Sequence, residues 1–393
     1  GWGHNELAAA GALDANGWLT AIPPQITSAS LLILTDLPVG TGGVAGRYVL
    51  TWQGAGSLNI TGRVSNVVIG ANTASFDFTP GPGLVGINIT AVTNGNPIRN
   101  MTCVREDRAA LLAGGQVFNP DWLARIRGAK TIRFMDWQIT NNSPIVTVAD
   151  RPRLTDYTWG RVGTPIEVMV ALANELNAHP WINIPHQAND ALCTLYANTL
   201  RDGLEPGLIA HVEYSNEVWN FQFSQATWAN DRGRDRWNAE STWVQYYALR
   251  AMQIMDLFTA SFGAQASTRL CRVIATQTGF LGLEQQILAS PRVIADGLGS
   301  PHLKFDAYAI TGYFSGLLGN DEKGALVRQW ITASQTAAEN AADGLGLTGQ
   351  ARTDYIAANR YNQAVTTAIG EIRNGVVTGQ LGDSVQEWVG TTL

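Results

Sequence analysis

The chain has 393 residues, which is enough for two or three domains or one large one. Apolar residues make up 45% of it and charged residues 15%, a balance that excludes a disordered chain or a coiled coil. The formal net charge of −6 argues against a nucleic-acid-binding surface. No apolar run approaches the roughly 20 residues of a membrane span. The chain starts at Gly1 without a recognisable signal peptide, which is typical of a processed chain or a fragment.

Cysteine and histidine are sparse. Cys103, Cys193 and Cys271 are widely spaced and do not form a disulfide framework. No CxxC or HExxH motif occurs and the five histidines are scattered, so we expect no metal site and no cofactor. The 13 tryptophans are more informative, because exposed aromatic faces are common in ligand clefts.

Residues 20–110 are predicted to form a β-sandwich domain, after an N-terminal segment at 1–19. Short runs rich in valine, isoleucine, threonine and aromatics are separated by clusters of glycine, proline and asparagine, a pattern typical of sandwiches. The predicted strands are 31–34, 47–52, 57–61, 75–78 and 86–92. Because this part contains almost no lysine, glutamate or histidine, we expect a packing or carbohydrate-binding role rather than a chemical one.

Residues 111–393 are predicted to form an α/β domain in which strands and helices alternate. The predicted strands are 131–137, 181–186, 208–215, 268–276 and 305–314, and the predicted helices are 165–179, 190–204, 239–262, 283–289, 323–342 and 351–373. Strict alternation indicates parallel βα units, which fit a (β/α)₈ barrel of the TIM type or an open doubly wound sheet. No GxGxxG or GxxxxGK[ST] motif follows any of the strands, which disfavours a nucleotide site and favours the barrel.

The active site of such a barrel lies at the carboxyl ends of its strands. The side chains predicted there are few acids, several hydrogen-bonding groups and several aromatics. They are Arg133, Asp136, Trp137, Asn141, Asn142, His186, Asn189, Asp190, Tyr214, Asn216, Glu217, Trp219, Gln277 and Tyr313. Sugar recognition needs this mixture, because polar groups meet hydroxyls and aromatic faces meet the C–H faces of the rings. Glu217 could protonate a glycosidic oxygen if burial raises its pKa.

The segment 211–220, HVEYSNEVWN, resembles the fourth-strand segment of clan A glycoside hydrolases. More narrowly, it resembles a bacterial group of cellulase-like proteins that carry the stretch EYSNEVWN. Segments 134–137 and 180–186 also resemble that group, and the resemblance covers most of residues 110–315. It implies a barrel in which 131–137 is strand 2 and the β-rich segment is an insertion between strands 1 and 2.

The resemblance also implies roles for individual residues. Glu217 would be the general acid/base and Asn216 would contact the sugar 2-hydroxyl. Arg133 on strand 2 would support the nucleophile, and Tyr313 on strand 6 would donate a hydrogen bond to it. His186 on strand 3 would line the site.

The departure from the family pattern concerns the second carboxylate. A retaining enzyme needs it on strand 7, roughly 5 Å from the first. Only strands 2 to 6 are recognisable, Glu371 falls in a predicted helix, and Glu387 falls in a stretch of ambiguous type, so no nucleophile is identified in this chain. We expect either a longer polypeptide, which we favour because open parallel edges are costly, or an incomplete and inactive relative.

Several residues keep alternative interpretations. Trp137 and Trp219 are sugar platforms or packing residues, and Tyr214 and Asn141 are further candidates for substrate binding. Arg133 supports the nucleophile or pairs with a buried carboxylate, and Glu213 is expected to be a buried structural partner of an arginine.

The predicted function is that of a retaining β-glycoside hydrolase that acts on a polysaccharide. The alternative is a non-catalytic glycan-binding or structural module of a surface, fibre or virus-tail protein, built on a degenerate or truncated barrel. The expected partners are a glycan, further segments of a longer polypeptide, or subunits of an assembly, with no nucleic acid and no membrane span. The expected location is extracellular, on the cell surface or on a virion.

Overall fold

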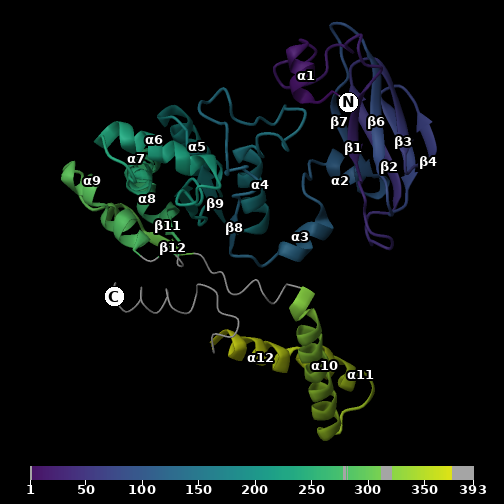
Figure 1. Ribbon diagram of the computed structural model, residues 1–393. Helices are drawn as coiled ribbons and strands as arrows, with labels where there is room; N and C mark the ends of the chain where they lie inside the picture. The colour runs from purple at the N-terminus through teal and green to yellow at the C-terminus, as the bar shows by residue number, and fades with distance from the viewer. Residues whose placement is uncertain (1, 278–279, 281, 311–320, 374–393) are drawn as a thin grey trace. The chain divides into compact units, whose positions relative to one another are not determined.

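The computed structural model describes residues 2–277, 280, 282–310 and 321–373. Its contacts divide the chain into two compact units. The first comprises Gly1–His211 with Leu257–Leu270, and the second comprises Val212–Asp256 with Cys271–Leu393. An antiparallel β-rich part and a parallel α/β part are both present (Figure 1).

Two antiparallel sheets form the β-rich part and confirm the predicted sandwich-like architecture (Figure 1). The strand orders are β1-β6-β3 and β4-β5-β2-β7. The strands are β1 (Ala29–Ile33), β2 (Gly46–Gln53), β3 (Gly56–Gly62), β4 (Ser65–Ile69), β5 (Thr73–Phe78), β6 (Val85–Val92) and β7 (Arg99–Arg105). Strands β4 and β7 were not predicted.

The core between these sheets follows from the two-residue periodicity of the strands. Along β5, Ala74, Phe76 and Phe78 are buried and alternate with more exposed residues. The ring of Phe76 stacks on that of Tyr48 with centroids 5.5 Å apart. Ala12 belongs to the same buried cluster, so part of the N-terminal segment packs with the sandwich.

Five strands form the second sheet in the order β12-β11-β10-β9-β8. They are β8 (Thr131–Arg133), β9 (His179–Ile184), β10 (Ala210–Tyr214), β11 (Leu270–Thr276) and β12 (Ala307–Ile310). The pairs β8–β9 and β11–β12 are parallel. The strand order is sequential, as in a barrel. Within the described residues, these five strands match the predicted strands 2 to 6 of an incomplete barrel, and a complete (β/α)₈ barrel is not present.

The prediction of a strand over 131–137 is wrong beyond Arg133. The chain turns there, because the amide of Gln138 donates to the carbonyl of Phe134 at 3.0 Å and that of Ile139 to Asp136 at 3.0 Å. Ile139 adopts a left-handed conformation with φ of 46°. Asp136 and Trp137 therefore lie on a turn after the strand.

Helices connect the strands of this sheet. The longer ones are α4 (Ile166–Leu176), α5 (Asp190–Gly203), α6 (Ser224–Trp237) and α7 (Trp243–Phe262). Three further helices follow β12 in the chain, namely α10 (Asp321–Gly344), α11 (Gly349–Asn359) and α12 (Asn362–Arg373). The side chain of Asn189 caps α5 by accepting a hydrogen bond from the amide of Leu192 at 2.9 Å. In α5, the side chains of Leu192, Tyr196 and Leu200 are buried, as the apolar stripe of an amphipathic helix requires.

Three helix predictions need correction. The predicted helix 239–262 begins later, as α7, and α6 before it was not predicted. The predicted helix 283–289 contains a π-helix at Gln285–Ala289. The predicted helix 351–373 consists of α11 and α12.

The remaining helices are short. They are α1 (His4–Ala9), α2 (Ala109–Ala113), α3 (Pro120–Ile126), α8 (Ala266–Arg269) and α9 (Pro291–Ala295), with 3₁₀ turns at Glu106–Arg108, Gly263–Gln265 and Pro301–Lys304. Among the described residues, no helix has the length and apolar character that crossing a membrane requires.

Candidate functional site at the end of strand β10

Strand β10 carries the segment that gave the family resemblance. Its Val212 and Tyr214 are buried, and the exposed fraction of Glu213 is 2%, in agreement with the expected burial of Glu213. The ring of Tyr214 stacks on that of Tyr247 of α7 with centroids 5.8 Å apart. The hydroxyl of Tyr247 accepts a hydrogen bond from the amide of Ala275 in β11 at 3.1 Å. The structure thus places Tyr214, a predicted substrate-binding residue, in the interior.

The turn that follows β10 has an unusual backbone. Ser215 and Glu217 both adopt left-handed conformations, with φ of 59° and 42°. Such conformations are uncommon for residues other than glycine and cost on the order of 1–3 kcal/mol each when the surroundings enforce them. They cluster at functional sites, so the backbone supports the interpretation of this turn as a site.

Contacts from α6 and from the next turn hold these residues. The fully buried Gln225 donates from Nε2 to the carbonyl oxygen of Asn216 at 2.8 Å. Glu217 is half-buried, and its Oε2 accepts a hydrogen bond from Nδ2 of Asn220 at 3.0 Å. The backbone amide of Asn220 also donates to the carbonyl of Glu217 at 2.8 Å. Sequence analysis missed both supporting residues, Asn220 and Gln225, although Asn220 lies inside the resembling segment.

The rest of this segment is mostly interior. The exposed fractions of Asn216 and Trp219 are 6% and 9%. Little of the Trp219 ring is therefore accessible to a sugar, whereas Glu217 as a residue is only half-buried.

The site residues predicted near β8 and β9 belong to the first unit. The exposed guanidinium of Arg133 lies over the ring of Trp181, 5.4 Å from its centroid. The ring of Trp137 stacks on that of Trp122 at 5.9 Å and contacts Phe134 at 5.4 Å. Trp137 is thus part of an aromatic cluster. Asn141 is half-buried after the turn.

His186 follows β9 and is 2% exposed. Burial lowers its pKa from 6.5 to about 4, because a charged imidazolium is poorly solvated in the interior. His186 is therefore neutral at pH 7 and can act there only as a neutral hydrogen-bonding group.

We expect the free energy of unfolding to depend on pH through His186. Between pH 6.5 and pH 4 the unfolded chain binds a proton at this residue and the folded chain does not, so stability falls as the pH is lowered. Over the full interval this group accounts for a loss of about 3 kcal/mol. Denaturant titrations of the wild type and of His186→Gln across this range measure the difference.

The control for this measurement is His302→Gln at an exposed position. The variant lacking His186 should lose less stability on acidification than the wild type, whereas the His302 variant should follow the wild type. Parallel curves for all three proteins would contradict the expected behaviour of His186.

Three further residues of the sequence analysis remain to be placed. Tyr313 and Glu387 are outside the described residues. Glu371 lies on α12, as the helix prediction implied. Among the described residues, no cluster of histidine, cysteine, aspartate or glutamate could hold a metal ion.

Comparison with known proteins finds one weak structural similarity. Searches against protein-family models and against curated proteins find no match. Among solved structures, the chain is similar to the CBM22-1 and GH10 modules of the N-terminal endo-1,4-β-D-xylanase 10B of Clostridium thermocellum, complexed with xylohexaose. The identity is 12%, the match covers 82% of this chain and 79% of that chain, and the TM-score is 0.31. A similarity this weak shows neither a shared family nor a shared activity.

Proposed function

We propose that this chain carries the acid/base part of a retaining β-glycoside hydrolase site for a polysaccharide, with Glu217 as the general acid/base. The observation that carries the proposal is the Asn216–Glu217 pair in a left-handed turn directly after β10. Sites of α/β barrels lie at the carboxyl ends of the strands. A half-buried glutamate there has both access to a substrate and a fixed orientation.

The chemistry assigned to Glu217 is a proton transfer in each of two steps. In the first, the carboxylic acid protonates the leaving glycosidic oxygen while a second carboxylate attacks the anomeric carbon. In the second, the resulting carboxylate of Glu217 removes a proton from water, which cleaves the glycosyl-enzyme bond and releases the sugar. The hydrogen bond from Asn220 fixes the orientation of the carboxyl group.

The remaining proposed roles follow the family resemblance. Asn216 contacts the sugar 2-hydroxyl, and Arg133 and Tyr313 support a nucleophile that is not identified in this chain. The proposed substrate-binding residues are His186, Trp137, Trp219, Tyr214 and Asn141. The burial of Tyr214, Trp219 and His186 favours interior roles for these three, so Trp137 and Asn141 are the better candidates for substrate contact.

We also propose the wider organisation that the sequence suggests. An N-terminal segment at 1–19 and a sandwich at 20–110 precede a hydrolase-like domain at 111–393. The location is proposed to be extracellular, on a cell surface or on a virion.

The second candidate function is glycan binding without cleavage. It is favoured by the five strands found in the parallel sheet of the described residues, because a complete barrel of this type has eight. The same turn after β10 would then hold a glycan through Asn216 and Glu217.

One experiment separates the two functions. The protein is incubated with soluble β-glucan and xylan, reducing ends are quantified, and glycan affinity is measured in parallel by affinity electrophoresis. Release of reducing ends supports the hydrolase. Retardation by a glycan without release of reducing ends supports the binding module. If the β-linked polysaccharides caused neither release nor retardation, both proposed functions would be refuted.

A further inference from the structure

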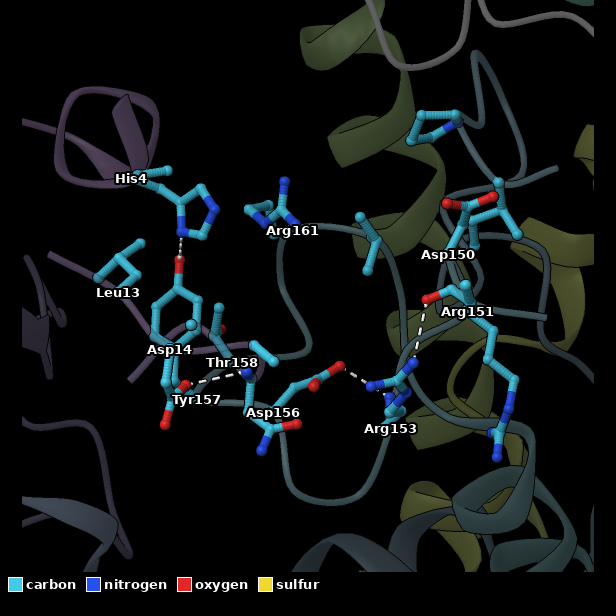
Figure 2. Close-up of a pocket in the computed structure, with 18 residues that line it drawn as sticks. His4, Leu13, Asp14, Asp150, Arg151, Arg153, Asp156, Tyr157, Thr158 and Arg161 are labelled. Atoms are coloured by element: carbon cyan, nitrogen blue, oxygen red, sulfur yellow. Dashed lines mark hydrogen bonds between the residues drawn. The ribbon is translucent and has the colours of Figure 1, made fainter. Parts of the chain in front are cut away.

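A cavity of about 440 Å³ lies within the first unit, far in sequence from Glu217 (Figure 2). Its walls come from the N-terminal segment, through His4 and residues 13–17, and from the loop 144–162. This volume falls within the range of small-molecule sites, roughly 300–1,000 Å³.

Direct contacts between the two segments build this cavity. The hydroxyl of Tyr157 and Nδ1 of His4 are 3.0 Å apart and share a hydrogen bond, and the two rings are stacked with centroids 5.5 Å apart. The amide of Tyr157 donates to the carbonyl of Asn16 at 3.0 Å. A Cβ atom at Gly17 would lie 2.4 Å from the ring of Tyr157, so glycine is needed for this close approach. The wall is therefore preformed.

The carboxylates that line the cavity accept hydrogen bonds from nearby backbone amides. Asp14, Asp150 and Asp156 each accept a hydrogen bond from a backbone amide two to four residues away, at 2.7–2.9 Å. For Asp150, the hydrogen bonds from the backbone and side chain of Thr147 lower the pKa of the carboxyl group. These three carboxylates stabilise the turns through hydrogen bonds to backbone amides.

The arginines of the cavity differ in how they are engaged. Arg151 pairs with Glu167 at 2.8 Å, and Arg153 donates to the carbonyl of Ala149 at 3.2 Å. Arg161 is exposed, and its guanidinium makes no ion pair and no hydrogen bond within the part of the chain that the structure describes. The pKa of His4 is lowered mainly by burial and, to a smaller extent, by the positive charge of Arg161. Figure 2 shows His4 and Arg161 at the same end of the cavity.

We propose that this cavity binds a small acidic sugar, whose carboxylate or phosphate pairs with Arg161 while its hydroxyls meet the polar wall. Guanidinium binds carboxylate and phosphate in a planar, two-point geometry. The three arginines and three aspartates of the wall balance in formal charge. Selection for an anion therefore comes from the available donors of Arg161 rather than from net charge. This proposal does not depend on the function of Glu217.

Three probes that differ only at one carbon test the proposal on the full chain. Glucuronate carries a carboxylate, glucose 6-phosphate carries a phosphate, and glucose carries neither. Affinities are measured by isothermal titration calorimetry. We expect at least one of the two acidic probes to bind about tenfold more tightly than glucose, since charge-assisted hydrogen bonds contribute that much. The tighter of the two acidic probes identifies the kind of acid.

The variant Arg161→Ala should weaken binding of the acidic probe about tenfold, and it should fold, because the side chain is exposed and has no partner among the described residues. Arg127→Ala, at another exposed arginine, makes the same change in net charge and should leave the affinity unchanged. Equal affinity for glucose, no binding of either acid, or an Arg161→Ala variant with wild-type affinity would each overturn the proposal.

Discussion

Replacing Glu217 by glutamine should reduce the release of reducing ends from a polysaccharide substrate by about a thousandfold, since general acid/base catalysis contributes roughly 10²–10⁴ in rate. Glutamine has the same shape but cannot supply or accept the proton at physiological pH. Its amide oxygen can still accept the hydrogen bond from Nδ2 of Asn220, which now holds Oε2 at 3.0 Å. The turn after β10 should therefore persist, and the affinity for the glycan should change little.

The control for this prediction is Glu175→Gln, which removes one carboxylate from an exposed position on α4. Glu175→Gln should leave hydrolysis unchanged. The melting temperature should be unchanged in both variants. If the Glu217 variant hydrolysed the substrate at the wild-type rate, another residue would have to be the acid. A loss of hydrolysis that came with a large fall in melting temperature would indicate a structural role instead.

The parallel sheet could be predicted because its strands are apolar and alternate with helices. All five expected strands occur, in sequential order, although β8 ends early. Strand β4 was missed because every residue of Ser65–Ile69 is exposed, so no alternation marks it. Helix α6 was missed because it is highly charged. Its Gly233 allows close packing on Thr242, a tertiary contact that the local sequence does not reveal.

The sequence singles out Asn216 and Glu217 as candidates through the family-like segment, but it does not give the geometry around them. The left-handed backbone of Ser215 and Glu217 depends on contacts such as that of Gln225 with Asn216. Gln225 lies on α6, which was not predicted, so its role could not be inferred. The burial of Tyr214 could not be read from alternation, because Val212, Glu213 and Tyr214 are all buried and both faces of β10 are therefore covered.

The largest loss of stability is expected from Phe76→Ala in the sandwich. The side chain of Phe76 is fully buried and its ring stacks on that of Tyr48. Truncation removes the transfer free energy of the ring and leaves a cavity that neighbours on β2 and β5 can fill only in part, since Tyr48 and Phe76 are paired across these strands. Such changes cost about 3–5 kcal/mol, as measured by the free energy of unfolding in denaturant.

The matched control is Val68→Ala on the adjacent strand β4, where the side chain is 59% exposed. The loss in its free energy of unfolding should stay within about 0.5 kcal/mol, because surface substitutions remove little buried area.

If the sandwich is a domain of its own, as we propose for 20–110, Phe76→Ala should lower the temperature of one unfolding transition and leave the other unchanged. In addition, the hydrolysis that we propose for Glu217 should then survive at temperatures between the weakened transition and the unchanged one. A single transition that shifts as a whole would instead indicate that the sandwich and the parallel sheet unfold together, and a loss below about 1 kcal/mol would contradict the predicted packing of Phe76.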